Sequence, residues 1–512
     1  MLRSGAVDAP CKPKAGPWIL SAAILGTSMA FIDGTVVNVA LPALQSSFRA
    51  TVIDVQWVVE AYGLFLGALI LMGGSAGDLF GRRRMFMSGV ALFAVASAAC
   101  GLARNIDQLI AARALQGIGA ALLTPGSLAI ISASFPEQER GRAIGTWSGF
   151  SAITTALGPV LGGWLIQHAS WRWIFFINLP LAAAVILISW WRVPESRGPV
   201  AKQIDLPGAL VVTVGLGGLV YGLIESPQLG WGHIRVIGSL GLGVACLIGF
   251  PLIEARAGSP MVPLKLFRAR TFTGANLLTL FLYAALGIFF FVFPMNLIQV
   301  QGYSATAAGA AALPLILLIF FLSRWSGGLV ARYGPRLPLI VGPIIAALGF
   351  ALFAVPSVGG AYWSTFLPAF VVLGFGMAVS IAPLTTVVMG AVDPDHAGAA
   401  SGINNAVARV AGLLAIAVFG IVMVNAFGVR LDHELAILEV SQHARDEVQS
   451  NRVRLAAIEV PYDVDPKFAP GVKVAISSAF LFAFRIVACS SALLALASAA
   501  TATLLIDRKS PP

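Results

Sequence analysis

Long apolar segments recur along the whole chain and restrict its fold more than any other feature. Each is at least 18 residues long, which is enough to cross a hydrocarbon layer of about 30 Å. The fourteen segments cover residues 18–41, 55–76, 85–103, 108–132, 143–166, 173–191, 207–225, 235–254, 273–298, 307–330, 337–356, 363–388, 403–427 and 476–506. A backbone in lipid must satisfy its own hydrogen bonds, and these segments are too long for barrel strands. The sequence therefore predicts an all-α integral membrane protein with 14 transmembrane helices.

The composition agrees with this class. Hydrophobic residues make up 58% of the 512 residues and charged residues only 11%, whereas a water-soluble domain has about 25% charged residues. The first apolar segment follows a 17-residue polar tail and lacks a small-residue cleavage site with a mature domain behind it. We therefore expect an uncleaved first helix rather than a removed signal peptide.

The distribution of lysine and arginine predicts the orientation in the membrane. With the N-terminus inside, the inner segments hold nineteen of these residues and the short outer loops hold four. Such an excess is typical of cytoplasmic loops and accounts for most of the net charge of +10 without a nucleic acid partner. The long outer segment 428–475 carries six more basic residues, but long loops escape this rule. The sequence thus predicts a multi-pass protein of the cell membrane with both termini cytoplasmic.

The second half of the chain repeats motifs of the first half. GDLFGRRR (77–84) resembles ARYGPR (331–336), and LQGIGAALLTPGS (115–127) resembles VLGFGMAVSIAPLT (372–385). A third pair is ERGRAIG and DHAGAASG, and the members of each pair lie about 253 to 258 residues apart. Repeats of this kind build transporters, which bind substrate between the halves and alternate access by rocking one half against the other.

The repeat divides the chain into two six-helix bundles related by an internal repeat, with two extra linker helices between them. The expected domains are a cytoplasmic tail (1–17), an N-terminal bundle (18–192), two additional helices (207–254) and a C-terminal bundle (273–506). The C-terminal bundle includes an extracytoplasmic loop, 428–475. Within this loop Leu431, Leu435 and Leu438 recur on one helical face, which predicts a short amphipathic helix on the outer surface.

Six motifs together resemble one known family. They are IDGTVVNVALP in the first segment, QWVVEAYGL in the second, GGSAGDLFGRRR after it, RALQGIGAA in the fourth, LGPVLGGWL in the fifth and WRWIFFINLP at the sixth. In these motifs the chain resembles the major facilitator superfamily, specifically its fourteen-helix drug/proton antiporters. The resemblance covers essentially the whole length, and it implies the same transporter fold as the repeat.

Asp33 is an ionisable residue inside the first apolar segment, with no lysine or arginine nearby. Such a residue is costly in a membrane and marks a functional site by default, and burial favours its neutral, proton-bound form. A site that holds either a proton or a cation couples the two fluxes, and the resemblance gives the acid of this motif the same role. The alternative is a carboxylate that caps or hydrogen-bonds a neighbouring helix. We favour the proton-coupling interpretation.

Arg113 is expected to be the partner of Asp33. Eight residues separate Asp33 from Leu41 and six separate Arg113 from Asp107, or about 12 Å and 9 Å of helix measured from the outer ends. The two charges therefore lie at similar depth. The resemblance associates this arginine with proton transfer, and a structural ion pair between the first and fourth helices is an equally good interpretation.

Glu60 lies near the outer end of the second segment, beside Trp57 and Tyr62. A small polar residue is more frequent here in the family that the sequence resembles. Glu60 is either a second site for a proton or cation or a carboxylate that reaches interfacial water, and we favour the second interpretation.

Asp78, Arg82 and Arg83 lie at the inner mouth of the second and third segments. A carboxylate facing a basic loop can form contacts that break and re-form as the halves rock, and the resemblance assigns this motif to gating. Leu79 replaces an arginine that is common in the motif, and Ala331 replaces the acid in the second half. The alternative is that the arginines only hold the loop inside.

The fifth segment contains the GPVLGG motif, which the resemblance marks as the antiporter motif. Gly158 and Gly162 share one helical face, which lets another helix approach closely, and Pro159 frees a backbone carbonyl. The motif ends with Gly163. Thr154, one turn of helix before Gly158, stands where the family usually has glycine. The motif therefore does not predict close helix packing at that turn. Generic packing of small residues explains most of this pattern, and only the resemblance favours exchange.

Six further residues are candidates for lining a substrate cavity. They are Trp57, Tyr62, Asn38, Asn276, Tyr283 and Asn296. The sequence has no Gly-Lys dipeptide and no HExxH motif or paired metal ligands, so it predicts neither a P-loop nor a metal site. The four cysteines, Cys11, Cys100, Cys246 and Cys489, are scattered and are expected to be packing residues. No cofactor is expected, with the proton gradient as the energy source.

These features predict a proton-coupled antiporter, not an enzyme, that exports hydrophobic, cationic drugs or toxic compounds across the inner membrane by alternating access. The same fold carries other cargo, so an exporter of a lipid, siderophore or other metabolite is the alternative. A channel needs a continuous polar path and a membrane-embedded enzyme needs a reactive constellation, and the sequence shows neither. The expected partners are protons, membrane lipids and a small lipophilic substrate, without nucleic acid, and the protein is expected to be a monomer.

Overall fold

The computed structural model describes residues 15–198, 203–393, 396–438, 440–460, 464 and 466–507. Within these residues the structure is helical and contains no strand. Thirteen helical segments of the described part are long and apolar enough to cross a membrane, and α14 (Arg336–Leu352) is a shorter apolar helix. Together they correspond to the 14 predicted segments. Residues 1–14 of the predicted tail, including Cys11, lie outside the described residues.

The N-terminal bundle and the two linker helices follow one another along the chain. The helices are α1 (Gly16–Phe48), α2 (Val52–Phe80), α3 (Arg82–Leu102), α4 (Ile106–Ser134), α5 (Glu137–His168), α6 (Trp173–Phe176), α7 (Asn178–Arg192), α8 (Leu206–Leu229) and α9 (Ile234–Glu254). Local sequence explains several of their ends. Thr51 and Asp54 form a capping box at the start of α2, and the Asn105 side chain accepts from the backbone N–H of Gln108 at the start of α4.

The C-terminal bundle contains the remaining helices. They are η1 (Leu264–Arg268), α10 (Arg270–Met295), η2 (Asn296–Val300), α11 (Ala305–Ala310), α12 (Leu313–Gly327), α13 (Leu329–Tyr333), α14, α15 (Tyr362–Thr365), α16 (Leu367–Gly390), α17 (Ala397–Ile437), α18 (Gln442–Ser450), η4 (Arg452–Ala457) and α19 (Ala469–Leu505). The tenth predicted segment is thus divided among α11, α12 and the first residues of α13, and the eleventh is shorter than predicted because α14 ends at Leu352.

The internal repeat is visible in the way that helices pack. A methyl group built on Gly89 of α3 would lie 2.9 Å from the carbonyl oxygen of Gly119 in α4. In the second half, a methyl group on Gly342 of α14 would lie 3.0 Å from the carbonyl oxygen of Gly376 in α16. Small residues let helices approach closely in both places. The two bundles therefore share the close packing of this helix pair on glycine residues as well as the order of their helices.

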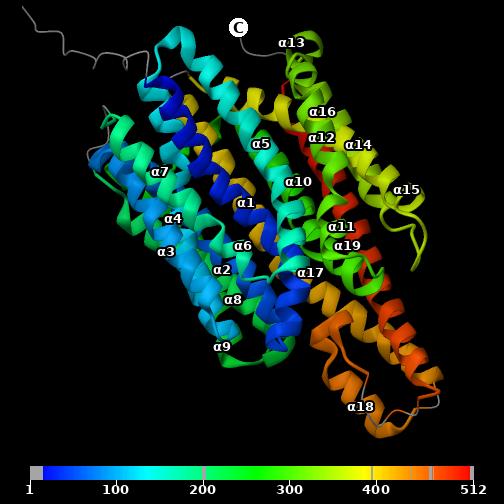
Figure 1. Cartoon of the computed structure of the whole chain (residues 1–512). Helices are drawn as coiled ribbons and strands as arrows, with labels where there is room; N and C mark the ends of the chain where they lie inside the picture. Colours follow the sequence, from blue (N-terminus) through cyan, green and yellow to red (C-terminus); the bar gives the residue numbers. More distant parts are fainter. Residues whose placement is uncertain are drawn as a thin grey trace, which may run out of the picture.

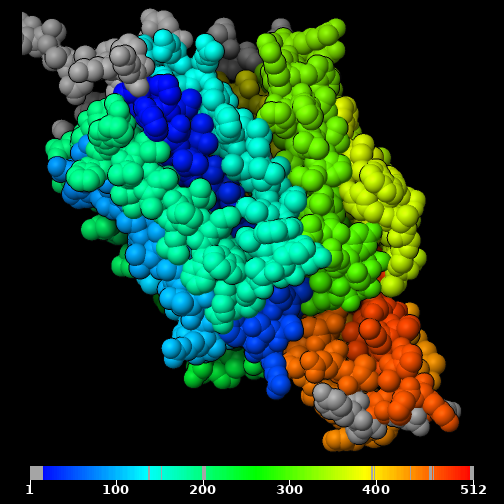
Figure 2. Space-filling model, in the orientation of Figure 1, coloured from blue at the N-terminus to red at the C-terminus, as the bar shows by residue number. Residues whose placement is uncertain are grey.

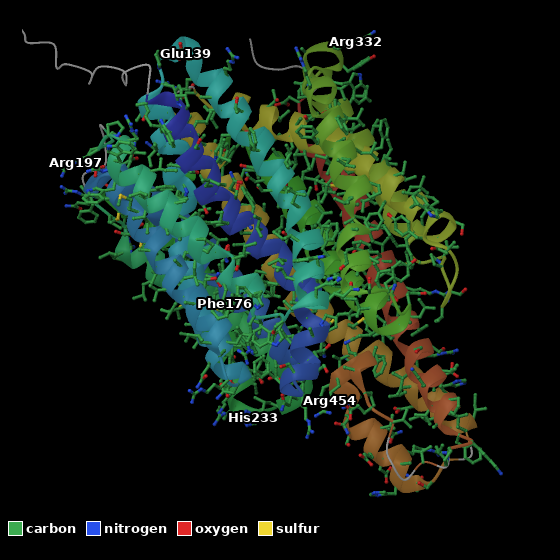
Figure 3. The ribbon with its side chains drawn as sticks, viewed as in Figure 1. Glu139, Phe176, Arg197, His233, Arg332 and Arg454 are labelled. Carbon is green, nitrogen blue, oxygen red and sulfur yellow. The ribbon has the colours of Figure 1, made fainter. Side chains whose placement is uncertain are left out.

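The two ends of the molecule correspond to the predicted sides of the membrane. Helix α1 begins and α19 ends at the end that lies opposite α18 (Figure 1). Arg197 and Arg332, which belong to predicted inner segments, lie at that same end, whereas His233 and Arg454 lie toward the other end (Figure 3). Which end faces the cytoplasm stays a prediction.

The linker helices α8 and α9 cover one side of the molecule. Helix α8 packs against α9 and also against α2 and α17, so it touches both bundles. Most large side chains of α9 are exposed, among them Ile234, Ile237 and Ile248. Exposed apolar side chains on an apolar helix are suited to lipid rather than to water.

The polar segment 428–475 differs from the predicted surface helix. Helix α17 continues to Ile437, so Leu431 and Leu435 lie on its distal turns and are fully buried there. Together with α18, η4 and the start of α19, these turns form a lobe that projects beyond the bundle (Figure 2). The leucine spacing did indicate a helix, but that helix is the extension of a transmembrane helix and its apolar face is covered by the lobe.

Candidate functional site

Asp33 and Arg113 form a buried ion pair between α1 and α4. Nη1 of Arg113 donates to Oδ2 of Asp33, and both side chains are fully shielded from solvent. The contact joins two helices whose charges the sequence places at similar depth. A buried carboxylate is tolerated in such a setting when it is paired and hydrogen-bonded.

Three further polar side chains complete the surroundings of the ion pair. Gln116 donates from Nε2 to Oδ1 of Asp33 at 2.8 Å and accepts from Nη1 of Arg113 at 2.7 Å. Ser97 accepts from Gln116 at 3.3 Å and from Nδ2 of Asn178 at 3.0 Å. Sequence reasoning did not assign these residues, although Gln116 lies within a quoted motif, one turn of helix after Arg113. Both carboxylate oxygens of Asp33 are therefore satisfied by partners inside the N-terminal bundle.

Arg113 also contacts α2. Its Nε donates to the carbonyl oxygen of Val58 at 3.0 Å, and its guanidinium lies over the ring of Tyr62, 4.2 Å from the ring centroid. The hydroxyl of Tyr62 donates to the carbonyl oxygen of Ala30 at 3.3 Å. The arginine thus links three helices, and any movement of α2 relative to α1 and α4 changes its contacts.

A cavity of about 510 Å³ lies between the two bundles. Its walls come from α1, α2, α5, α10, α11, α12 and α17, and none of its lining residues belongs to the linker helices. Of the six predicted lining residues, Asn38, Tyr62 and Tyr283 are present, and Glu60 lines the cavity as well. Asp33 is absent from the lining, although its neighbours Gly34 and Thr35 are present. The ring of Tyr62 therefore belongs both to the cavity wall and to the surroundings of the ion pair.

The other three predicted lining residues lie elsewhere. Trp57 donates from Nε1 to Oε1 of Glu225 in α8 at 2.8 Å, so it faces the linker helices. Asn276 accepts a hydrogen bond from Nδ2 of Asn404 at 3.2 Å inside the C-terminal bundle. Asn296 is fully buried in the short π-helical turn that ends α10. For these three residues the prediction of a cavity position is wrong, since none of them lines the cavity. Asn276 has nearly the same helical phase as Tyr283, seven residues later, but lies about two turns away from it along α10.

Among the described residues, Glu60 is the one carboxylate that lines the cavity. It is buried, and neither carboxylate oxygen has a hydrogen-bond partner among the described residues. An unpaired ionised carboxylate in apolar surroundings is expensive, so this side chain favours a proton or a cationic partner. The interpretation that Glu60 reaches interfacial water does not fit this burial.

Arg409 of α17 is a cavity residue that sequence reasoning missed. It makes no ion pair or hydrogen bond within the described part of the chain, and its guanidinium lies 5.9 Å from the ring centroid of Phe31. A methyl group built on Gly67 of α2 would lie 3.3 Å from its Cβ, so the Arg409 side chain starts where α17 packs directly on α2. It is the only charged residue in the segment 403–427, and the rule applied to Asp33 would have found it.

The predicted gating residues form contacts within the N-terminal bundle. Arg82 donates from Nε to Oδ1 of Asp78 at 2.8 Å, and its Nη1 donates to the carbonyl oxygen of Ala129 at 3.4 Å. The carbonyl oxygen of Asp78 accepts from the N–H of Gly198 at 3.0 Å. Asp78 therefore ties α2 to α3 and to the segment that follows α7.

Glu195 is a second acid in this region that the sequence did not reveal. It accepts from the backbone N–H of Arg83 at 3.0 Å and lies 3.6 Å from Nε of Arg84. Gly81 between the two helices has φ of 114°, and a methyl group there would lie 2.7 Å from Oε1 of Glu195. The turn requires glycine because of this positive φ. Arg83 also donates to the carbonyl oxygen of Val193 at 3.1 Å, so the loop is fixed on two sides.

The glycines of the antiporter motif bring α5 close to two other helices. Methyl groups on Gly158 and Gly162 would lie 2.4 Å from Oγ1 of Thr35 and 1.9 Å from Cγ2 of Val36, both in α1. A methyl group on Gly163 would lie 2.2 Å from the carbonyl oxygen of Ala305 in α11. Helix α5 therefore packs on the turn of α1 that follows Asp33 and also on the opposite bundle.

Hydrogen bonds between the bundles gather toward one end of the molecule. Nε2 of Gln299 donates to Oε1 of Gln45 at 2.9 Å, and Oγ1 of Thr306 donates to Oε1 of Gln167 at 2.7 Å. Pro159 takes part through close backbone packing, since a methyl group on Gly309 would lie 2.0 Å from its carbonyl oxygen. These contacts lie toward the end that the charge distribution predicts to be outside. They join the two bundles on that side of the cavity.

Two repeated six-helix bundles with a cavity between them define a secondary transporter. The model of the Major Facilitator Superfamily matches residues 23–416, and the chain belongs to this family. Multidrug resistance protein Stp of Mycobacterium tuberculosis is 37% identical over 406 residues, which cover 78% of this chain and 74% of that protein. The Tetracenomycin C resistance and export protein of Streptomyces glaucescens is 35% identical over 429 residues, covering 83% of this chain and 79% of that protein.

Solved structures agree on the fold. A bacterial homolog of the human lysosomal transporter Spinster, in an inward-facing and unoccupied conformation, matches with a TM-score of 0.68 at 17% identity. The match covers 98% of this chain and 100% of that one. At this identity the likeness shows the fold alone.

Proposed function

We propose that this protein exports lipophilic drug-like compounds from the cell in exchange for protons. The observation that carries the proposal is the cavity between the bundles, which is apolar apart from a few side chains and holds an unpaired buried carboxylate, Glu60. The names of the related resistance and export proteins support the same kind of cargo. The protein is proposed to act as a monomer in the cell membrane, with both termini in the cytoplasm. It is proposed to need no cofactor and to use the proton gradient as its energy source.

Asp33 is proposed to be the proton-coupling residue, and Glu60 is a second acidic position with different access. Glu60 faces the cavity and can hold either a proton or the cationic group of a substrate. Asp33 lies behind Tyr62 and is already paired with Arg113, so a substrate in the cavity does not touch it in this conformation. The expectation that Asp33 itself holds either a proton or a cation is therefore replaced in this proposal by an indirect route.

Tyr62 and Arg113 provide that route. A substrate that displaces Tyr62 changes the surface on which the Arg113 guanidinium rests, and Arg113 in turn holds Asp33 and the carbonyl of Val58. Loosening of these contacts lowers the stabilisation of the ionised Asp33 and favours proton uptake. Helix α5 transmits movement of α1 to the opposite bundle through Gly163.

The test is transport by purified protein in proteoliposomes with an imposed pH gradient. Tetraphenylphosphonium and rhodamine 123 serve as lipophilic cations, and a neutral dye serves as the comparison. Proton release that accompanies uptake of a compound, and loss of uptake when the gradient is dissipated, are the expected results. Uptake that proceeds equally without the gradient contradicts proton coupling, and absence of transport for every compound contradicts drug export.

A further inference from the structure

The cavity holds two unpaired groups of opposite charge at different depths. Glu60 and Arg409 both line it, and no ion pair joins them within the described residues. Arg409 packs opposite Gly67, seven residues along α2 from Glu60, which corresponds to about 10 Å of helix. The cavity therefore has an acidic pole at Glu60 and a basic pole at Arg409, whose Cβ packs about two turns farther along α2.

Arg409 has no structural reason to be charged at this place. A guanidinium stays protonated in proteins, and within a membrane it is retained where it faces a water-filled space or an anionic partner. No carboxylate of the described residues forms an ion pair with it, and its guanidinium lies 5.9 Å from the ring centroid of Phe31. An arginine that served only for packing could be replaced by an apolar residue without this cost.

Two phenol groups lie near the basic pole. Tyr62 and Tyr283 line the same cavity, and the charge of Arg409 lies close enough to act electrostatically on both. The Tyr62 hydroxyl is occupied by the carbonyl of Ala30, whereas Tyr283 makes no hydrogen bond to the described residues. A planar guanidinium with a free hydroxyl beside it suits a flat anionic oxygen group, such as a carboxylate or a phenolate.

We propose that Arg409 is a specificity-determining residue that binds a carboxylate or phenolate group of the exported compound, with the apolar ring body of the compound against α10 and α12. The proposal rests on the proposed function and narrows its substrate class. The preferred compound is then a ring system with an acidic oxygen at one end and, for Glu60, a cationic or hydrogen-bond-donating group at the other. Lipophilic cations, which the sequence favoured, use only the acidic pole.

Two dyes that share a xanthene ring system separate the poles. Fluorescein is anionic through a carboxylate and a phenolate at mildly alkaline pH, and rhodamine 123 is cationic. Their binding to the purified full-length protein in detergent is measured by fluorescence anisotropy. The wild-type protein is expected to bind both dyes. Arg409→Gln is expected to weaken fluorescein binding by about tenfold or more, since a hydrogen bond to a charged group is lost, and to leave rhodamine 123 binding unchanged or stronger.

Two other variants serve as controls. Arg409→Lys keeps the charge and is expected to retain most fluorescein binding, and Arg332→Gln removes an arginine at the end of the molecule and is expected to leave both dyes unaffected (Figure 3). Equal loss of both dyes in Arg409→Gln would show a packing role and overturn the proposal. A wild-type protein that binds rhodamine 123 but not fluorescein, or neither dye, would overturn it as well.

The binding measurement tests the role of Arg409, and the transport measurement tests the proposed proton-coupled export, so the two proposals can fail independently. If Arg409→Gln loses fluorescein selectively while no compound moves with the pH gradient, the specificity proposal stands and the proposed proton-coupled export does not. If transport is coupled to protons but fluorescein binding does not depend on Arg409, export stands and the specificity proposal is wrong.

Discussion

In the N-terminal bundle an ion pair joins the first and fourth spans, whereas phenylalanine rings make the corresponding contact in the C-terminal bundle. Gly117 and Gly119 of α4 align with Gly374 and Gly376 of α16, a shift of 257 residues. The same shift places Phe370 at the position of Arg113. The ring of Phe370 lies 5.1 Å from that of Phe293 in α10, the first span of its bundle.

The surroundings of these two contacts differ in the same way. The ion pair is enclosed by amide and hydroxyl groups of Gln116, Ser97 and Asn178. The phenylalanine contact belongs to an aromatic cluster that includes Phe289 and Phe353, whose ring centroids are 4.5 Å apart. Aromatic pairs of this kind contribute about 0.5–1.5 kcal/mol each beyond the burial of their area. One helix arrangement therefore supports a polar core in one bundle and an apolar core in the other, which suggests that stability alone does not require the ion pair.

The largest effect is expected from removing the charge of Asp33. Asp33→Asn fixes a neutral side chain of the same shape, so it should abolish export driven by a pH gradient while the protein still inserts and folds. Asp33→Glu should keep partial activity with a shifted pH optimum, because the longer side chain changes the distance to Arg113. The measurement is uptake of rhodamine 123 into everted vesicles at equal protein level.

A matched variant of the apolar core is the control for Asp33. Phe370→Leu alters the corresponding contact of the C-terminal bundle and is expected to lower stability while leaving the dependence on the proton gradient intact. If Asp33→Asn transports at the wild-type rate with undiminished dependence on the gradient, proton coupling does not reside in the polar core.

The polar core around Asp33 and Arg113 can be converted into an apolar one by substitution, and a smaller effect is expected from this change. Arg113→Leu leaves Asp33 buried without its charged partner, and breaking a buried pair in this way costs about 3–5 kcal/mol. The double variant Asp33→Leu, Arg113→Leu removes both charges and is expected to regain at least half of that loss, but not proton-driven transport. Thermal unfolding of the purified variants in detergent measures the stability. A double variant no more stable than Arg113→Leu would mean that the ion pair is needed for folding.

The third prediction concerns the gating motif, which only the first half contains in full. Asp78→Asn is expected to slow transport several-fold with little change in substrate binding, because Asp78 contacts Arg82 and Gly198 far from the cavity. Removing Arg83, which holds the loop through Val193, should do similar harm. In the second half Ala331 replaces the acid, so Arg332→Gln should leave the transport rate almost unchanged. A large loss of binding affinity with a normal transport rate in Asp78→Asn would contradict a gating role.

The sequence predicted those parts of the site that depend on one helix or on a short motif. Asp33 and Arg113 follow from charge in an apolar segment and from depth along a helix. Trp57 was placed wrongly because Glu225, its partner, comes from a linker helix outside the repeat. Glu195 reaches the gating motif from a segment more than a hundred residues away in sequence. Such contacts depend on how the helices pack, which no local pattern encodes.

Helical phase alone does not explain where Trp57, Glu60 and Tyr62 lie. Successive residues of a helix are rotated by about 100°, so Trp57 and Glu60 lie about 60° apart around α2, whereas Tyr62 lies about 160° from Glu60. Nevertheless Trp57 donates to Glu225 of α8, and both Glu60 and Tyr62 line the cavity. The depth of a residue can thus be predicted from the sequence, but the direction in which it faces requires the neighbouring helices.

The smallest effect is expected at Glu60, the acid that the cavity exposes to substrate. Glu60→Gln keeps the size and hydrogen-bonding capacity of the side chain but removes its charge, so affinity for tetraphenylphosphonium should fall a few-fold while neutral compounds are affected less. The Asp33–Arg113 pair is untouched, because its oxygens are satisfied within the N-terminal bundle. Proton-driven transport of neutral compounds should therefore persist in this variant, with a narrower range of cations. Complete loss of proton coupling in Glu60→Gln would move the proton site from the polar core of the N-terminal bundle to the cavity wall, and the difference between the two bundles would then be one of stability rather than of function.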